Sequence, residues 1–98
     1  MAKGYILAEV EVTDPALFET YRPPAAASIA AFGGKYLVRG GATEVLEGEG
    51  ESGRMVLLEF SSPERAMEWY RSVEYQKAVA IRLKAATTEV RLMAGVDS

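Results

Sequence analysis

The stretch Tyr5-Ile6-Leu7-Ala8-Glu9-Val10-Glu11-Val12, followed by Thr13-Asp14-Pro15, sets the beginning of the fold. Apolar side chains recur at every second position of residues 5–12, and this strict alternation is typical of a β-strand. A helix is then predicted, because the Asp14 carboxylate can cap free backbone N–H groups and Pro15 suits the first helical position. The chain therefore opens with a strand that is followed at once by a helix.

The rest of the chain repeats this pattern of strands and helices. The first helix is expected to break or kink at Pro23-Pro24, because proline lacks a backbone donor and clashes with the preceding turn. It resumes to Phe32 and stops at Gly33-Gly34. Further strands are expected at residues 35–47, 54–60 and 88–94, and helical segments from residue 63 and over 73–84. The paired glycines of Arg39-Gly40-Gly41 predict a bulge in the second strand.

The order of these elements is strand, helix, strand, strand, helix, strand. It predicts an α+β fold of ferredoxin-like βαββαβ topology, with a four-stranded antiparallel sheet and both helices on one face. The 98 residues fit one domain, which we take as residues 1–98. We detect no linker and no low-complexity segment.

The sheet face away from the helices predicts a homodimer. It carries several large apolar side chains, namely Tyr5, Leu7, Met55, Leu57 and Met93. An exposed apolar patch of this kind usually marks an interface. Two sheets packed face to face would bury it and enclose a partly polar cavity. The alternative is a monomer with an open apolar face.

Composition excludes several classes of function. The net charge of −3 provides no basic surface for nucleic acid or for an anionic membrane. The chain has no Cys and no His, so we expect no Ser-His-Asp or Cys-His catalysis, no disulfide and no histidine or thiolate metal site. Glu9 and Glu11 argue against a signal peptide or membrane span at the N-terminus. We therefore expect a cytoplasmic protein without metal or cofactor.

Residues 48–53 match the dinucleotide fingerprint G-x-G-x-x-G letter for letter. The context is wrong for that function, because a strand follows and no helix N-terminus would face a pyrophosphate. The surrounding glutamates would also repel phosphate. We interpret the segment as an acidic hairpin loop, and its carboxylates lack the alternating ligand spacing of a calcium loop.

Arg39 is the main candidate for ligand binding. Glu59 is expected on the neighbouring strand, so the two side chains predict either a structural ion pair or a site that orients an anion. Tyr70 and Tyr75 bring hydroxyl groups that need partners when buried, and a tyrosine near an arginine can bind or protonate an oxyanion. Simple packing is the alternative for both tyrosines.

Over nearly its whole length the chain resembles the "domain of unknown function 1330" family, which belongs to the dimeric α+β barrel superfamily. The similarity rests on motifs in order: Gly4-Tyr5, Val12-Thr13-Asp14-Pro15, Phe18, Tyr21, Gly33-Gly34-Lys35-Tyr36-Leu37-Val38-Arg39-Gly40-Gly41, Leu58-Glu59-Phe60, Trp69-Tyr70, Ser72, Glu74-Tyr75-Gln76 and Arg82. The chain departs from the family pattern at Val73, where a proline is expected, and at Pro23-Pro24. The resemblance implies the dimeric barrel and the cleft candidates Arg39, Glu59, Tyr70, Tyr75 and Arg82. It implies no activity, although relatives in the superfamily include cofactor-free monooxygenases, isomerases and haem-handling enzymes.

The sequence thus favours a homodimer that binds a small acidic or phenolic organic ligand in a cleft near Arg39. A cofactor-free enzyme acting on such a ligand is one form of this hypothesis. The alternative is a non-catalytic structural or interaction protein whose cleft is filled by side chains. An open polar pocket beside Arg39 would favour the first hypothesis, and a filled interior the second.

Overall fold

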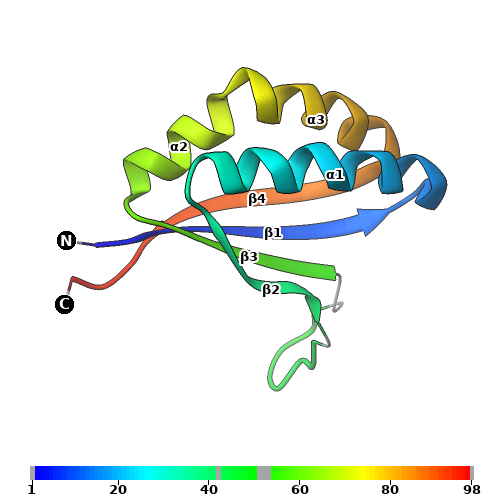
Figure 1. Cartoon of the computed structure of the whole chain (residues 1–98). Helices are drawn as coiled ribbons and strands as arrows, with labels where there is room; N and C mark the ends of the chain where they lie inside the picture. Colours follow the sequence, from blue (N-terminus) through cyan, green and yellow to red (C-terminus); the bar gives the residue numbers. More distant parts are fainter. Residues whose placement is uncertain (1, 42, 51–53, 98) are drawn as a thin grey trace.

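The computed structural model describes residues 2–41, 43–50 and 54–97 (Figure 1). The elements follow the order expected from the sequence: β1 (Gly4–Val12), α1 (Pro15–Ala31), β2 (Lys35–Gly41), β3 (Arg54–Phe60), α2 (Pro63–Arg71), α3 (Val73–Ala85) and β4 (Ala86–Ala94). Ser72 separates α2 from α3, and its hydroxyl caps α3 by accepting a hydrogen bond of 3.1 Å from the Tyr75 backbone N–H.

The four strands form one antiparallel sheet in the order β2-β3-β1-β4. All three helices cover the same face of this sheet, and the start of β1 and the end of β4 lie side by side at one end of it (Figure 1). There the Gly95 N–H donates to the Lys3 carbonyl at 2.7 Å. The predicted ferredoxin-like βαββαβ fold is therefore confirmed.

The core lies between the helices and the inner face of the sheet, which is the face that the helices cover. Phe60, Trp69 and Tyr75 are almost fully buried there, and the Trp69 and Tyr75 rings lie 4.0 Å apart between centroids. The Trp69 indole N–H donates to the Ser28 hydroxyl at 3.0 Å, so the buried donor is satisfied. This layer holds α1, α2 and α3 in place over the strands.

Of the break or kink expected at Pro23-Pro24, the break is wrong, because α1 runs as one helix through both prolines. The two prolines remove the donors that would have reached the carbonyls of Glu19 and Thr20. Both of those residues are exposed, so water can bond to the freed carbonyls. Burial of Ala25, Ser28 and Ile29 beyond the prolines keeps the second half of the helix on the core.

The second strand is shorter than expected and more irregular. β2 ends at Gly41, and residues 43–50 form no strand but a loop that projects away from the helices (Figure 1). The pairing of β2 with β3 shifts register twice, once between Tyr36 and Val38 and once between Arg39 and Gly41. The second shift is the bulge that the glycines predict. The last part of the glycine fingerprint, residues 51–53, lies outside the described residues.

Among the described residues, no helix combines the length and the apolar character that crossing a membrane would require.

Candidate functional site

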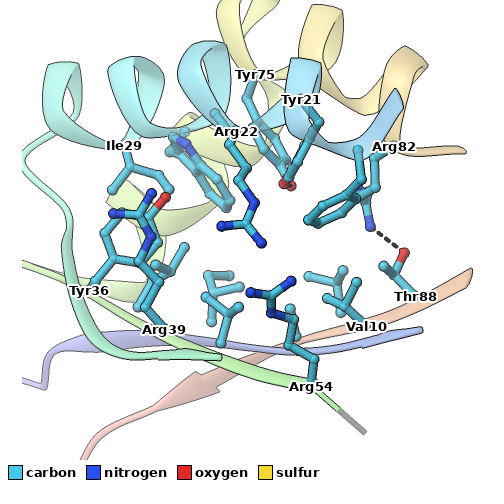
Figure 2. A pocket seen from close by; sticks show the side chains of 18 residues that line it. Val10, Tyr21, Arg22, Ile29, Tyr36, Arg39, Arg54, Tyr75, Arg82 and Thr88 are labelled. Carbon is cyan, nitrogen blue, oxygen red and sulfur yellow. Dashed lines mark hydrogen bonds between the residues drawn. The ribbon is translucent and has the colours of Figure 1, made fainter. Parts of the chain in front are cut away.

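A cavity of about 70 Å³ opens between α1 and the inner face of the sheet (Figure 2). This volume is enough for several water molecules. Most of its wall is apolar and comes from the strands and from α1. It is lined by Ile6, Ala8, Val10, Phe18, Tyr21, Arg22, Ala25, Ile29, Tyr36, Arg39, Arg54, Val56, Leu58, Trp69, Tyr75, Arg82, Thr88 and Val90.

Four arginines from four elements project into this apolar cavity. Arg22 comes from α1, Arg39 from β2, Arg54 from β3 and Arg82 from α3 (Figure 2). Among the described residues that line the cavity there is no carboxylate. Guanidinium groups keep their charge at any physiological pH and bind carboxylates through paired N–H donors. The cavity therefore has the chemistry of an anion site.

Two of these arginines have donors that the protein leaves unused. Arg82 is 5% exposed and donates through Nη1 to the Thr88 hydroxyl, while its buried Nε has no hydrogen-bond partner. The buried Nε of Arg22 lies 3.4 Å from the exposed carboxylate of Glu19 but makes no hydrogen bond. Buried donors without partners are rare in folded proteins and destabilise them.

The other two arginines lie at the exposed edge of the cavity. The Arg39 guanidinium stacks 4.4 Å from the centre of the Tyr36 ring. Arg54 lies against Gly40, which has a positive φ of 66°. A Cβ atom at Gly40 would come within 2.6 Å of Arg54 Nε, so the glycine leaves space for this guanidinium.

A pair of tyrosines lies beside the buried arginine. The hydroxyl groups of Tyr21 and Tyr75 are 2.8 Å apart and share one hydrogen bond. Burial raises the pKa of Tyr21 far above its ordinary value. Burial also raises the pKa of Tyr75, although the Arg82 charge acts in the opposite direction. Both hydroxyls are therefore protonated at neutral pH and act as hydrogen-bond donors rather than as bases.

The structure brings together three of the five predicted site residues, Arg39, Tyr75 and Arg82. Tyr70 does not line the cavity; its ring packs 6.2 Å from that of Trp69 and 5.9 Å from that of Tyr75, between centroids. Glu59 lies on the opposite, outer face of the sheet. Arg39 and Glu59 therefore lie on opposite faces of the sheet and do not face a common cavity.

Glu59 instead belongs to a cluster on the outer face. Its carboxylate accepts hydrogen bonds from the Tyr5 hydroxyl at 3.1 Å and from Lys3 Nζ at 3.4 Å, and Lys35 Nζ is 3.7 Å away. Desolvation tends to raise the pKa of Glu59, but the bonds from Tyr5 and Lys3 outweigh it and hold that pKa below its usual range. This carboxylate has a structural role in the sheet.

The bulge between Tyr36 and Val38 explains why Arg39 is on the inner face. Lys35 pairs with Glu59 and Tyr36 with Leu58, so regular pairing would set Arg39 opposite Met55 on the outer face. The register shift pairs Arg39 with Val56 instead. A shift of one residue turns a side chain to the other face of a sheet.

The sequence interpretation missed Arg22, Arg54 and Tyr21 as site residues, although their positions carry a signal. Arg22 follows Phe18 by four residues and therefore lies on the core-facing side of α1. Arg54 precedes Val56 by two residues and shares its face of the strand. A charged residue at a position that periodicity assigns to the core is the signal that would have identified both arginines.

Within the described part of the chain, no group of three or more acidic side chains is placed to hold a metal ion.

Comparisons with known proteins agree with this fold. A family model described as "Domain of unknown function (DUF1330)" matches residues 3–96. The chain is similar to a crystal structure of a protein of unknown function from Rhodopseudomonas palustris, with 17% identity, a TM-score of 0.77, and coverage of 99% of this chain and 85% of that one. No match was found among curated proteins.

Two other solved structures bear on function and assembly. SnoaB, a cofactor-independent oxygenase from Streptomyces nogalater, has 14% identity and a TM-score of 0.67, with coverage of 100% of this chain and 97% of that one. A dimeric ferredoxin-like protein of unknown function from Thermobifida fusca has 10% identity and a TM-score of 0.57, with coverage of 95% and 91%. At these identities the likeness concerns the fold.

Proposed function

Because the chain belongs to the family described as a domain of unknown function (DUF1330), whose description assigns no activity, we propose a function from the geometry of its cavity. The protein binds a small organic anion, a carboxylate or phenolate, between α1 and the inner face of the sheet. Arg22, Arg39, Arg54 and Arg82 supply the positive charge, and the apolar wall holds the body of the ligand.

One observation carries this proposal: four guanidinium groups converge on one apolar cavity whose described lining includes no carboxylate. Charged groups inside proteins are normally paired, because removing them from water is costly. A ligand anion would supply the missing partner. The space itself argues against the alternative of a structural protein with a filled cleft.

The tyrosine pair is the feature that would allow catalysis on such a ligand. A protonated hydroxyl beside a guanidinium can stabilise an oxyanion or give it a proton. Tyr21 and Tyr75 hold this position next to Arg82. The similar fold of a cofactor-independent oxygenase is compatible with a cofactor-free enzyme. Binding is the function that the cavity supports best.

Thermal unfolding tests the binding proposal. Benzoate, 4-hydroxybenzoate and glutarate should raise the Tm of the wild-type protein, and neutral benzamide should not. A ligand at ten times its Kd stabilises the folded state by about 1.4 kcal/mol.

Arg39→Met keeps much of the side-chain volume but removes the charge and should reduce the shift in Tm. Arg71→Met, which changes an exposed arginine outside the cavity, is the matched control. Equal shifts with benzamide and benzoate, or no shift with any of these anions, would contradict the proposal.

We also propose that two copies associate through the outer face of the sheet. Leu7, Met55 and Leu57 are only partly buried there, and Leu37 and Met93 are more than 40% exposed. A protein of similar fold is described as dimeric. Light scattering should give about twice the chain mass of 10.6 kDa.

The cytoplasmic location expected from the sequence stays a prediction.

A further inference from the structure

The polar groups of the cavity form two clusters that differ in depth. The rim cluster consists of Arg22, Arg39 and Arg54 with Tyr36, and the deep cluster consists of Tyr21, Tyr75 and Arg82 with Thr88. Arg39 and Arg54 are exposed and the Arg22 side chain is 32% exposed, whereas Tyr75 and Arg82 are 3% and 5% exposed. Burial raises the pKa of all three tyrosines, and Tyr36 also acts on both deep tyrosines. Against burial, Arg39 and Arg22 act to lower the pKa of Tyr36, and Arg82 acts to lower those of Tyr21 and Tyr75.

The rim cluster has an excess of positive charge. Arg22 descends from α1 and Arg54 rises from β3, and in Figure 2 their guanidinium groups point toward one another across the cavity. The only carboxylate that the described residues bring to this cluster is Glu19, whose side chain is 67% exposed. Facing cations repel each other, most strongly where water is partly excluded. An acid group held between them would replace this repulsion with charge-assisted hydrogen bonds.

The deep cluster has unused donors. Each tyrosine hydroxyl carries one proton, and the single bond between Tyr21 and Tyr75 uses only one of the two. The remaining O–H has no hydrogen-bond partner among the described residues. Arg82 beside them also keeps one N–H without a partner. A second acid group at this end, in addition to the one at the rim cluster, would accept a hydrogen bond from the free hydroxyl and offset the charge of Arg82.

The surface between the two clusters is apolar. Val10 of β1 pairs with Arg54 of the rim cluster on one side and with Thr88 of the deep cluster on the other. Ala8, the next residue of β1 on this face, lies between Val56 and Val90, and all four apolar residues line the cavity. Such a surface favours a hydrocarbon or aromatic body and provides no partners for a polar one.

We propose, on the basis of the function proposed above, that the ligand is a small diacid with two separate acid groups on one apolar body. One acid group lies at the rim cluster and the other at the deep cluster. The dicarboxylic acids are the simplest class with this chemistry.

Calorimetric titration of the whole protein with matched probes tests the inference. The probes are glutarate, adipate, isophthalate and terephthalate, each beside its monoamide, which has nearly the same size and one charge fewer. At least one diacid should bind about tenfold or more tightly than its monoamide, since hydrogen bonds from guanidinium to a carboxylate are stronger than those to a neutral amide. Arg54→Met at the exposed rim and Tyr75→Phe in the deep cluster should each reduce this preference. Arg71→Met should leave it unchanged.

Two results would overturn the inference and leave the proposed function standing. Diacids and monoamides of equal affinity would mean that only one acid group is recognised. Tighter binding of phenyl phosphate than of every diacid would mean that one doubly charged group fits better than two separate ones. Failure of all these anions to bind would instead contradict the proposed function. Circular dichroism and the Tm of each variant without ligand establish that the substitutions leave the fold intact.

Discussion

Gly40 connects the backbone of β2 with the charge of the cavity. Its positive φ of 66° is strained for any residue with a side chain, and its missing Cβ makes room for the guanidinium of Arg54. The glycine pair was expected to form a bulge, and the structure shows that Gly40 also leaves space for the Arg54 guanidinium. Gly33 also has a positive φ, of 75°, yet no atom lies within 4 Å of the place where its Cβ would be. The two glycines therefore share the backbone strain and differ in their surroundings.

This difference yields a prediction for two alanine variants. Gly33→Ala and Gly40→Ala should each lower the free energy of unfolding by about 1–2 kcal/mol, because both place a side chain in the left-handed region. Only Gly40→Ala should also weaken binding of a small carboxylate, because it displaces Arg54 from the rim of the cavity. Urea unfolding and ligand titration of both variants provide the measurement. Equal affinities in the two variants would show that the position of Arg54 is unimportant for binding.

Periodicity alone would have placed three of the four arginines on the inner face, although the sequence analysis named only Arg82 of these three, through the family resemblance. Arg22 and Arg82 share helix faces with buried residues, since Arg22 follows Phe18 by four positions and Arg82 follows Tyr75 by seven. Arg54 shares its strand face with Leu58. Arg39 could not be assigned in this way, because the register shift between Tyr36 and Val38 turns its side chain from the outer to the inner face of the sheet. No turn residue marks that bulge in the sequence, so the face of Arg39 depends on tertiary pairing.

At the scale of elements, α1 shows that tertiary packing can maintain a helix through prolines that would be expected to interrupt it. Two consecutive prolines predicted a break, and the helix continues through both of them. The lost hydrogen bonds fall on the exposed side, and the buried side keeps its contacts with the sheet. The start of the same helix followed from local signals, the Asp14 cap and Pro15. The end of β2 did not, because the strand stops at Gly41 and not at residue 47.

Replacing Pro23 should therefore stabilise the protein. Pro23→Ala restores the backbone donor to the Glu19 carbonyl at an exposed position, and we expect a gain of about 1–3 kcal/mol. For a domain of this size each 1 kcal/mol raises the Tm by roughly 4–8 °C. Pro15→Ala is the control, because the N–H at the first helical position has no helical partner in any case. A lower Tm for Pro23→Ala would mean that the proline stabilises a local bend that the packing of α1 requires.

At the scale of the whole molecule, the two faces of the sheet have different roles. The inner face and α1 enclose the cavity with its four arginines. The outer face carries the apolar side chains and the Glu59 cluster, and the loop of residues 43–50 projects away from the helices (Figure 1). The dimer was expected to enclose a polar cavity between two sheets, whereas the cavity of this chain lies on the helix side. Ligand binding and association should therefore be separable.

Leu57→Arg tests this separation. Leu57 lies on the outer face, paired with Leu7 of β1 and Val38 of β2, so a charge there would be buried without a partner between two sheets. Light scattering should show that the variant has about half the mass of the wild type at micromolar concentration. Its affinity for a small carboxylate should stay close to that of the wild type, since the cavity opens on the other face. Leu83→Arg, at a position that is 70% exposed on α3, is the control for an added charge and should stay dimeric. A dimeric Leu57→Arg would place the interface on another surface, and a monomeric variant that no longer binds would show that the cavity depends on the partner.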